Sequence, residues 1–424
     1  MSKTLFVGID AHSKTNSACF MDQEGNVVVK SFSFPNNLPG AQELEQKIIS
    51  TMQQGNFTSL KIATESASFY DLHLVDFLAT SENLAPFSPE VYQFNPKLTS
   101  GFKKAYADKD KTDDIDAFVI ADRLRFGRLP KPYSQHQPYL PLRRLTRYRF
   151  HLVEAIWREK NYFLLHLFLK YSSFSALKPF SNTFGSASTA LILEDFSLDE
   201  LVEMPVEELV TFVMKHGHGR FENPQEVAEI VKRVARESYR IRPALASSVN
   251  LILAMTLQNI RTLSSALKEV NEAIAKEFKA FPNTLESVDG LGPVYSAGIF
   301  AEIGNIDNFH SQAGLAKFAG LTWRKSESGN FKAEVTRMTK TGNKYLRYYL
   351  IEAANSLRVH NEEYKAYYQA KLREVTKHRH KRAVALTARK LVRLIFSLLK
   401  NGQLYRPAVE RSVSADPPKG GSAC

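Results

Sequence analysis

The stretch TLFVGID, residues 4–10, has the apolar run of a buried β-strand and ends in a carboxylate. The stretch SLKIATE, residues 59–65, repeats this arrangement and ends in Glu65. Ligands of α/β sheets usually bind beyond the carboxyl ends of the strands. We therefore predict that Asp10 and Glu65 lie at one functional edge of a sheet.

A second group of acids follows in KAYADKDKTDDIDAF, residues 104–118. In a helix that starts there, Asp113 and Asp116 are three residues apart and share a face. Acids at a helix start also stabilise the helix dipole, which by itself explains their presence. Four carboxylates that converge from two strands and a helix would repel one another, however, unless a hard cation such as Mg²⁺ lies between them. The other aspartates are expected to be solvated loop acids: Asp108, Asp110 and Asp114.

The charge of the 424-residue chain favours a nucleic-acid partner. Its 56 Lys and Arg residues exceed its 44 Asp and Glu residues, which leaves a formal charge of +12. Basic side chains gain affinity for nucleic acids by releasing counterions from the phosphates. The two cysteines form neither a disulfide framework nor a metal pattern, and no apolar run is long enough to span a membrane. We therefore expect a soluble cytoplasmic protein with no membrane segment.

The predicted secondary structure changes along the chain. Residues 4–125 alternate strand and helix patterns, whereas 141–280 lack strand signals and carry long amphipathic stretches. These stretches predict an antiparallel helix pair within one chain or an oligomer-forming coil. We predict an α/β domain at 1–130, a helical or coiled-coil region at 131–280 with a helical insertion near 172–245, a mainly α domain at 281–405 and a disordered tail at 406–424.

The sequence KSESGN, residues 325–330, is an ordinary polar turn when it is considered alone. It is also surrounded by basic side chains, as are the aspartates. The residues predicted to contact nucleic acid are Lys103, Lys104, Lys111, Arg324, Lys325, Arg337, Lys340, Lys344 and Arg347. Residues 371–393 add nine Lys and Arg, in what is either a solvated helix face or a backbone-binding surface. Tyr345, Tyr348 and Tyr349 are candidates for base stacking or for core packing.

Several motifs together resemble the insertion-sequence-110 family of transposases, DEDD-type recombinases related to Piv-type DNA invertases. The motifs are GIDAH, ATES, KTDDIDA, GLGPVYSAGIFAEIG, FAGLTWRKSESG and RMTKTGNKYLR. The resemblance covers roughly residues 4–127 and 281–400. It implies a RuvC-like N-terminal domain of the RNase H fold, followed by a C-terminal transposase domain. The implied metal site is Asp10, Glu65, Asp113 and Asp116 with Mg²⁺, or alternatively Mn²⁺. The implied nucleophile is Ser328, and Ser326 is its nearest competitor.

The resemblance also implies an activity. A transposase of this kind cuts and rejoins donor and target DNA through a covalent phosphoserine intermediate. A structured noncoding bridge RNA, encoded by the element, pairs with both DNAs. The active assembly is a tetramer, a dimer of dimers, in which different subunits supply the tetrad and the serine. The expected location is the cytoplasm of a bacterium or archaeon, in association with the nucleoid.

Two other functions remain open on the residues alone. In the first, the same fold is a hydrolytic nuclease or junction resolvase, and Ser328 is structural. In the second, the protein binds nucleic acid without catalysis, and its acids only cap helices. Two features depart from the family pattern: the segment at 172–245 looks long, and Trp323 stands where proline is frequent. His12 is either a metal or phosphate contact or a polar residue at the strand exit.

Overall fold

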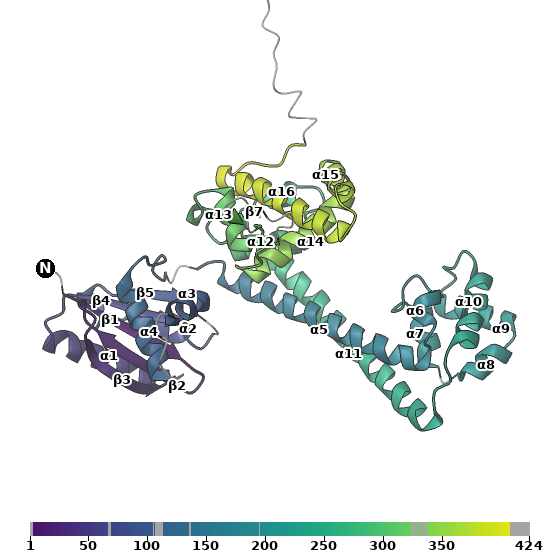
Figure 1. Ribbon diagram of the computed structural model, residues 1–424, viewed down its shortest axis with the longest axis horizontal. Helices are drawn as coiled ribbons and strands as arrows, with labels where there is room; N and C mark the ends of the chain where they lie inside the picture. The colour runs from purple at the N-terminus through teal and green to yellow at the C-terminus, as the bar shows by residue number, and fades with distance from the viewer. Residues whose placement is uncertain are drawn as a thin grey trace, which may run out of the picture. The chain divides into compact units, whose positions relative to one another are not determined.

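The structure, a computed structural model, describes residues 3–66, 69–104, 106, 113–134, 137–194, 196–323, 327–328, 331–332 and 337–407. The chain divides into two compact units, Met1–Pro138 and Tyr139–Cys424 (Figure 1). The first unit is α/β. In the second unit, the described secondary-structure elements are helices apart from one short hairpin. The predicted order of an α/β domain followed by a largely helical remainder is therefore confirmed.

A five-stranded mixed sheet forms the centre of the first unit. Its strands are β1 (Thr4–Ala11), β2 (Thr15–Met21), β3 (Val27–Pro35), β4 (Ser59–Glu65) and β5 (Glu90–Phe94). Their order across the sheet is β3-β2-β1-β4-β5. The first three strands form an antiparallel meander, whereas β1, β4 and β5 run parallel. The parallel strands therefore end at a common edge.

Helices cover both faces of this sheet, because successive side chains of a strand point to opposite sides. Leu5, Val7 and Ile9 of β1 pack into the core that contains α1 (Leu38–Gln54) and α2 (Leu72–Thr80). Phe6 packs on the other face, against α4 (Asp113–Phe126). A further short helix, α3 (Pro96–Lys103), follows β5 and was not predicted.

Gly8 allows α4 to lie directly on β1. A Cβ atom at this position would lie 2.2 Å from the backbone nitrogen of Ala121 and 2.4 Å from the carbonyl oxygen of Ala117. Contacts this short with backbone atoms cannot be relieved by a side-chain rotation. The glycine of the GID motif therefore sets the distance between the strand that carries Asp10 and the helix that begins with Asp113.

Two long helices, α5 (Leu140–Lys170) and α11 (Pro243–Phe278), run antiparallel in the second unit (Figure 1). Arg149 Nε donates to Asn271 Oδ1 at 2.8 Å, and Asn259 Nδ2 donates to Glu159 Oε2 at 3.3 Å. From the first contact to the second, the residue number rises from 149 to 159 in α5 and falls from 271 to 259 in α11. Of the two predicted arrangements, the antiparallel pair within one chain is therefore present.

Five shorter helices connect α5 to α11. They are α6 (Phe174–Leu177), α7 (Ser186–Leu193), α8 (Leu198–Glu203), α9 (Val206–Gly217) and α10 (Pro224–Glu237). Their apolar faces share a core with the ends of the long helices, and Phe163, Leu167 and Leu253 lie within it. Ser197 caps α8 in a reciprocal capping box with Glu200.

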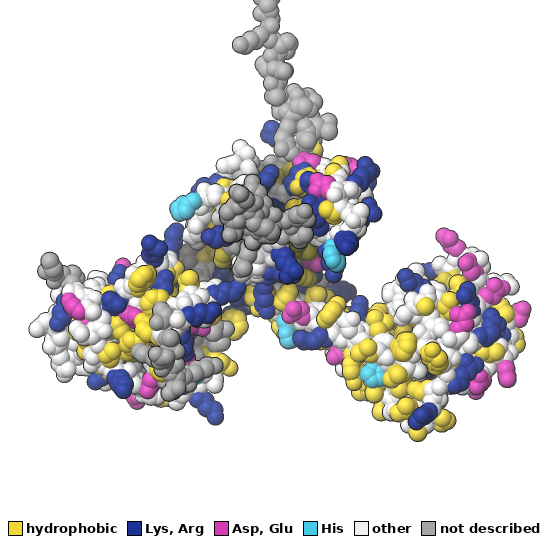
Figure 2. Space-filling view, in the orientation of Figure 1, with side chains coloured by type: hydrophobic (Ala, Val, Ile, Leu, Met, Phe, Trp, Pro, Cys, Tyr) yellow, Lys and Arg dark blue, Asp and Glu magenta, His cyan; other side chains and the backbone are white. Residues whose placement is uncertain are grey.

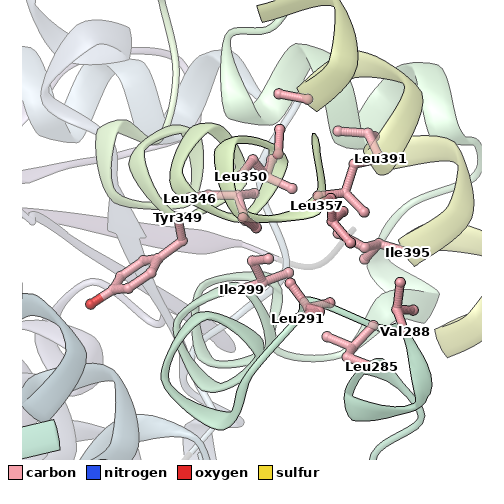
Figure 3. Close-up of a cluster of buried hydrophobic side chains, with 14 of the residues drawn as sticks. Leu285, Val288, Leu291, Ile299, Leu346, Tyr349, Leu350, Leu357, Leu391 and Ile395 are labelled. Atoms are coloured by element: carbon pink, nitrogen blue, oxygen red, sulfur yellow. The ribbon is translucent and has the colours of Figure 1, made fainter. Parts of the chain in front are cut away.

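The other ends of the long helices pack into a C-terminal bundle. The bundle contains α12 (Pro293–Ile303), α13 (Gln312–Ala319), α14 (Lys344–His360), α15 (Glu362–Arg373) and α16 (Arg379–Asn401). Figure 3 shows part of its core, in which Ile299 of α12, Leu350 of α14 and Leu391 of α16 come together. The strands β6 (Glu327–Ser328) and β7 (Phe331–Lys332) form an antiparallel hairpin between α13 and α14.

Across the ranges given above, no helix combines the length and apolarity that crossing a bilayer requires. Most of the segment expected to be a disordered tail, residues 406–424, lies outside the described residues.

Candidate functional site

Two of the four predicted acids lie at the ends of neighbouring parallel strands. Asp10 is the penultimate residue of β1, and Glu65 is the last residue of β4. Ile9 of β1 pairs with Thr64 of β4, so the two acids follow directly at the same edge of the sheet. This placement results from parallel pairing and from the position of each acid within its apolar run.

The first turn of α4 brings a third acid, Asp113, to this edge. His12 lies between Asp113 and Asp10. His12 Nε2 is 3.2 Å from Asp10 Oδ2 and 3.5 Å from Asp113 Oδ1. One ligand atom from each of these three residues lies within 4.8 Å of the other two. Asp10 is half-buried, whereas His12 and Asp113 are exposed.

Crowding of negative charge is visible at Asp10. Burial raises the pKa of its carboxyl group, and repulsion from the carboxylates of Asp116 and Asp113 raises it further. The neighbouring His12 acts in the opposite direction and lowers this pKa. A bound divalent cation would relieve the same repulsion, because its charge would stabilise the ionised carboxylates.

The other two predicted acids are close to this edge but engage other partners. Asp116 forms an ion pair with Lys103, which is the last residue of α3. Glu65 accepts a hydrogen bond from the hydroxyl group of Thr99 in α3. Among the described residues, neither acid belongs to the cluster of Asp10, His12 and Asp113. A metal site made of all four predicted acids would require Lys103 to release Asp116.

The donor set fits a divalent cation. Carboxylate oxygens are the ligands that Mg²⁺ and Mn²⁺ prefer, and an imidazole nitrogen is a common additional ligand of transition metals. Asp10 and Asp113 offer oxygen, and His12 offers nitrogen. From the sequence alone, His12 is either a metal or phosphate contact or a polar residue at the strand exit. Only the fold shows that its ring lies between two carboxylates.

The remaining aspartates of the acidic stretch have other positions. Asp114 was expected in a loop, but it lies in the first turn of α4, where it is exposed and accepts a hydrogen bond from Ser31. The expectation of a loop was wrong, because α4 already begins at Asp113. Asp108 and Asp110 lie outside the described residues, as does the basic residue Lys111.

The predicted nucleophile lies in the hairpin of the second unit. Ser328 is the last residue of β6, and its backbone pairs with Phe331 of β7. The base of this segment is joined by a hydrogen bond from Thr339 N to the carbonyl oxygen of Thr322 at 2.8 Å and by a bridge between Trp323 and Met338. Ser326 and the basic pair Arg324 and Lys325 lie outside the described residues.

The predicted nucleic-acid contacts that are described fall into two groups. Lys104, Arg337, Lys340 and Lys344 are exposed and remain accessible to a phosphate. Lys103 and Arg347 already have partners within the protein. Lys103 pairs with Asp116, and Arg347 Nη1 donates to the carbonyl oxygen of Ala319 at the end of α13.

Basic side chains also gather over α15 and the start of α16, where Figure 2 shows a cluster of dark blue. Several of these residues form ion pairs, such as Arg382 with Glu374 and Lys390 with Glu363. Lys377 and Lys381 are exposed. This region is therefore partly a set of intramolecular ion pairs and partly a basic surface.

The three tyrosines of α14 are not equivalent. Tyr349 is fully buried, and its hydroxyl group donates to the carbonyl oxygen of Thr146 at 2.6 Å. Tyr348 accepts a hydrogen bond from Arg149 of α5. Core packing, rather than base stacking, is therefore the role of Tyr349.

An ion pair between the buried Glu302 and the partly exposed Arg147, which the sequence did not predict, fixes α14, the helix that follows the hairpin. Glu302 of α12 is 1% exposed and accepts two hydrogen bonds from Arg147, at 2.7 and 2.9 Å. It also accepts one from Asn343, whose side-chain oxygen caps the first turn of α14. No local signal marks Glu302, because its partners are 155 and 41 residues away.

Two family comparisons match this chain. Residues 7–171 match the DEDD-type family of IS110 elements, which is described as a transposase. Residues 283–369 match the family described as Transposase IS116/IS110/IS902. The first match includes the strands and helix that carry Asp10, Glu65, Asp113 and Asp116, and the second includes the hairpin with Ser328.

Individual relatives agree with these matches. A 44.8 kDa protein of insertion element IS116 from Streptomyces clavuligerus is 25% identical over 72% of this chain and 75% of the relative. The transposase for insertion sequence element IS1111A from Coxiella burnetii is 28% identical over 43% of this chain and 53% of the relative. A 42 kDa protein of insertion element IS900 from Mycobacterium paratuberculosis is 24% identical over 72% of this chain.

An acidic cluster at the edge of this sheet and two matched transposase domains define an enzyme that cuts and rejoins DNA. The chain belongs to the IS110 family of transposases. Its DEDD-type domain also indicates that a divalent metal participates.

Proposed function

We propose that this transposase is an RNA-guided recombinase, in which Ser328 forms a covalent phosphoserine intermediate and the acids of the first unit hold Mg²⁺. The observation that carries the proposal is the convergence of Asp10, His12 and Asp113 at the end of β1. Asp10 belongs to β1, His12 lies just after the end of β1, and Asp113 begins α4, which is far along the chain. Helix capping alone would explain the acids of α4, but it would not explain why Asp113 lies next to His12 and Asp10.

The first unit has features that support a RuvC-like RNase H fold. Three antiparallel strands are followed by two parallel strands, and β1 lies at the centre of the order β3-β2-β1-β4-β5. The acids lie at the carboxyl end of the central strand, where α/β sheets place their ligands. We assign residues 1–130 to this domain, 131–280 to a helical region with an insertion near 172–245, and 281–405 to the transposase domain.

In the proposed metal site, Asp10 and Asp113 are ligands and His12 contributes a nitrogen. Glu65 and Asp116 complete the site when their hydrogen-bonded partners in α3 release them. When bound, the cation would neutralise charge on the scissile phosphate and on the leaving oxygen. The protein itself holds the acids in place through the packing of α4 on β1 at Gly8.

The proposed chemistry is two successive transesterifications. The oxygen of the Ser328 hydroxyl group bonds to the DNA phosphorus, and the bond from that phosphorus to a deoxyribose oxygen breaks. The serine proton passes to the departing deoxyribose oxygen. A hydroxyl group of another strand then attacks the phosphoserine, and its proton returns to Ser328. One phosphodiester is exchanged for another, so no nucleotide hydrolysis is required.

The exposed basic residues would hold the nucleic-acid backbones. Lys104 of the first unit, and Arg337, Lys340 and Lys344 around the hairpin, are accessible to phosphates. In this proposal a bridge RNA supplies sequence recognition by base pairing, while the protein binds the duplex backbones. Contacts of this kind depend strongly on salt, because each phosphate contact releases counterions.

The long helices favour assembly into an oligomer, for which we propose a tetramer. Trp157 and Leu165 of α5 are 67% and 65% exposed, and Leu251 and Met255 of α11 are also exposed. Each pair has helical spacing that places its members on one face. Figure 2 shows apolar side chains over this part of the helix pair. A surface of this kind is typical of a protein interface.

Covalent trapping tests the proposal. The purified protein is incubated with Mg²⁺, RNA from the region that flanks the element, and labelled junction DNA, and the products are separated on a denaturing gel. We expect a protein–DNA adduct that is lost in Ser328→Ala and kept in Ser326→Ala. Metal-dependent cleavage without an adduct would instead favour a hydrolytic nuclease. Binding without cleavage in every combination of RNA and DNA would favour a non-catalytic protein.

A further inference from the structure

A cavity of about 590 Å³ lies at the exit of β1, between the starts of α1 and α2. Its volume falls within the range of about 300–1,000 Å³ that is typical of small-ligand sites. It is bounded by the exit of β1, the start of α1 and the start of α2. The residues that decide its chemistry are Ser13, Asn36, Asn37, Phe69, Tyr70 and His73.

The lining combines aromatic faces with polar groups. Phe69 and Tyr70 are adjacent and about half exposed, at 56% and 52%. Leu74 and Phe77 add apolar surface. Hydroxyl, amide and imidazole groups of Ser13, Asn36 and His73 lie around the same space. A planar ligand with an apolar face and a hydrogen-bonding edge would match this lining.

One side chain connects the cavity to the acidic cluster. Asn36 Nδ2 donates to the carbonyl oxygen of His12 at 2.7 Å and to that of Tyr70 at 3.0 Å. His12 in turn lies within 3.5 Å of both Asp10 and Asp113. The aromatic rim and the candidate metal ligand are therefore held together by Asn36, and Ser13 follows His12 directly along the chain.

We propose that this cavity receives one unstacked DNA base, adjacent to the phosphate that lies at the acidic cluster. The inference rests on the proposed function, since it takes the cluster as the place where a DNA phosphate binds. Every base has a π face that can stack on Phe69 or Tyr70, and a polar edge that can bond to amide, hydroxyl or imidazole groups. Removal of a base from the stack also exposes the backbone around its phosphate.

The position of the cavity favours a nucleic-acid base over a protein segment as its occupant. Asn36 joins the backbone of His12 to the rim of the cavity, and Ser13 of the lining follows His12 directly. A base next to a phosphate bound at the acidic cluster would therefore reach the cavity around the exit of β1. Against an apolar peptide, the polar groups of Ser13 and His73 would lose contact with water without gaining a hydrogen bond, which is unfavourable.

Photocrosslinking to the full-length protein tests this inference. The probe is a single-stranded oligodeoxynucleotide in which 5-iodouracil replaces thymine, with Mg²⁺ present, and the corresponding oligoribonucleotide is a second arm. Trypsin would release residues 62–97 as one peptide, because no Lys or Arg lies between Lys61 and Lys97. We expect adducts on this peptide that fragmentation places at residues 69–77, with a higher yield for DNA than for RNA.

Two variants sharpen the test. Phe69→Ala with Tyr70→Leu should lower the adduct yield at least fivefold and raise the Kd for the DNA about tenfold, as expected for loss of stacking of one base. The matched control is Tyr239→Leu, which removes an aromatic side chain that is 81% exposed in the second unit and should change neither quantity. Circular dichroism of both variants checks that they are folded.

The outcomes separate this inference from the proposed function. Covalent DNA trapping at Ser328, together with DNA adducts that map elsewhere and an unchanged Kd in the double variant, would overturn the base pocket alone. A higher adduct yield with RNA than with DNA would also overturn it, because the occupant would then be an RNA base. A wild-type protein that binds neither probe would contradict both the pocket and the proposed function.

Discussion

At the scale of single residues, the candidate site depends on a few carboxylates whose neighbours differ sharply. Asp113 and Asp114 are adjacent in the first turn of α4, and both are exposed. Asp113 faces His12, whereas Asp114 accepts a hydrogen bond from Ser31. Adjacent residues of a helix point about 100° apart, so only one of the two can face β1.

This difference predicts unequal effects of the same substitution. Asp113→Asn removes one charged ligand and should weaken Mn²⁺ binding at least tenfold, which corresponds to about 1.4 kcal/mol. Asp114→Asn is the matched control and should leave the affinity unchanged. Isothermal titration calorimetry with Mn²⁺ measures both. Equal losses in the two variants would mean that general acidity, rather than a defined site, attracts the metal.

At the scale of elements, the site depends on how closely a helix can approach a strand. Gly8 and the backbone of α4 leave no room for a methyl group. Gly101 in α3 is different, because nothing lies within 4 Å of the Cβ atom that an alanine would add. The two glycines therefore separate the effect of close packing from the general effect of a glycine-to-alanine change.

We predict opposite outcomes for these two glycines. Gly8→Ala should destabilise the first unit by about 1–3 kcal/mol through overpacking, and should weaken Mn²⁺ binding by displacing Asp113. Gly101→Ala should be neutral or slightly stabilising, because alanine favours a helix interior. Hydrogen exchange of α4 amides, measured together with Mn²⁺ affinity, tests this. Normal protection of α4 in Gly8→Ala would show that the helix can shift without cost.

A second prediction at this scale concerns the buried pair of Glu302 and Arg147, which joins α12, α5 and the cap of α14. Glu302→Ala should destabilise the second unit by about 2–3 kcal/mol, because it removes charge-assisted hydrogen bonds from Arg147 and Asn343, while the partly exposed guanidinium group regains contact with water. Asp199→Ala breaks the exposed pair with Arg240 and should cost no more than about 1 kcal/mol.

Tryptophan fluorescence can follow the unfolding of the second unit by itself. Its two tryptophans, Trp157 and Trp323, both belong to the second unit, so the change of their fluorescence in urea follows the unfolding of that unit. A midpoint for Glu302→Ala that equals that of Asp199→Ala would show that the buried pair contributes little.

At the scale of the whole molecule, an exposed apolar face of α5 and α11 predicts self-association. Trp157→Ser combined with Leu165→Ser replaces two large apolar side chains by hydroxyls and should shift the protein toward smaller species in sedimentation velocity. Tyr239→Ser is the control, since this tyrosine is exposed but lies outside both helices. An identical distribution of species for all three proteins would place any oligomer interface elsewhere.

Much of this protein could be predicted from local patterns. Apolar runs that end in Asp10 and Glu65 indicated two strands, and in the structure both acids follow the paired residues Ile9 and Thr64. Helical spacing indicated the long helices before and after the insertion. These patterns are reliable because strand and helix periods are properties of neighbouring residues, which need no knowledge of the rest of the fold.

The sequence by itself therefore determined the α/β and helical parts and the basic character, and it indicated which acids are candidates to bind a metal. Only the tertiary structure decided that His12 lies between Asp10 and Asp113, that Lys103 pairs with Asp116 and that Glu302 joins three helices. The physical reason is that such contacts depend on how closely separate elements pack. The packing of α4 against Gly8 and the packing of the buried cores set the distance between elements. No periodic pattern in the sequence encodes this distance.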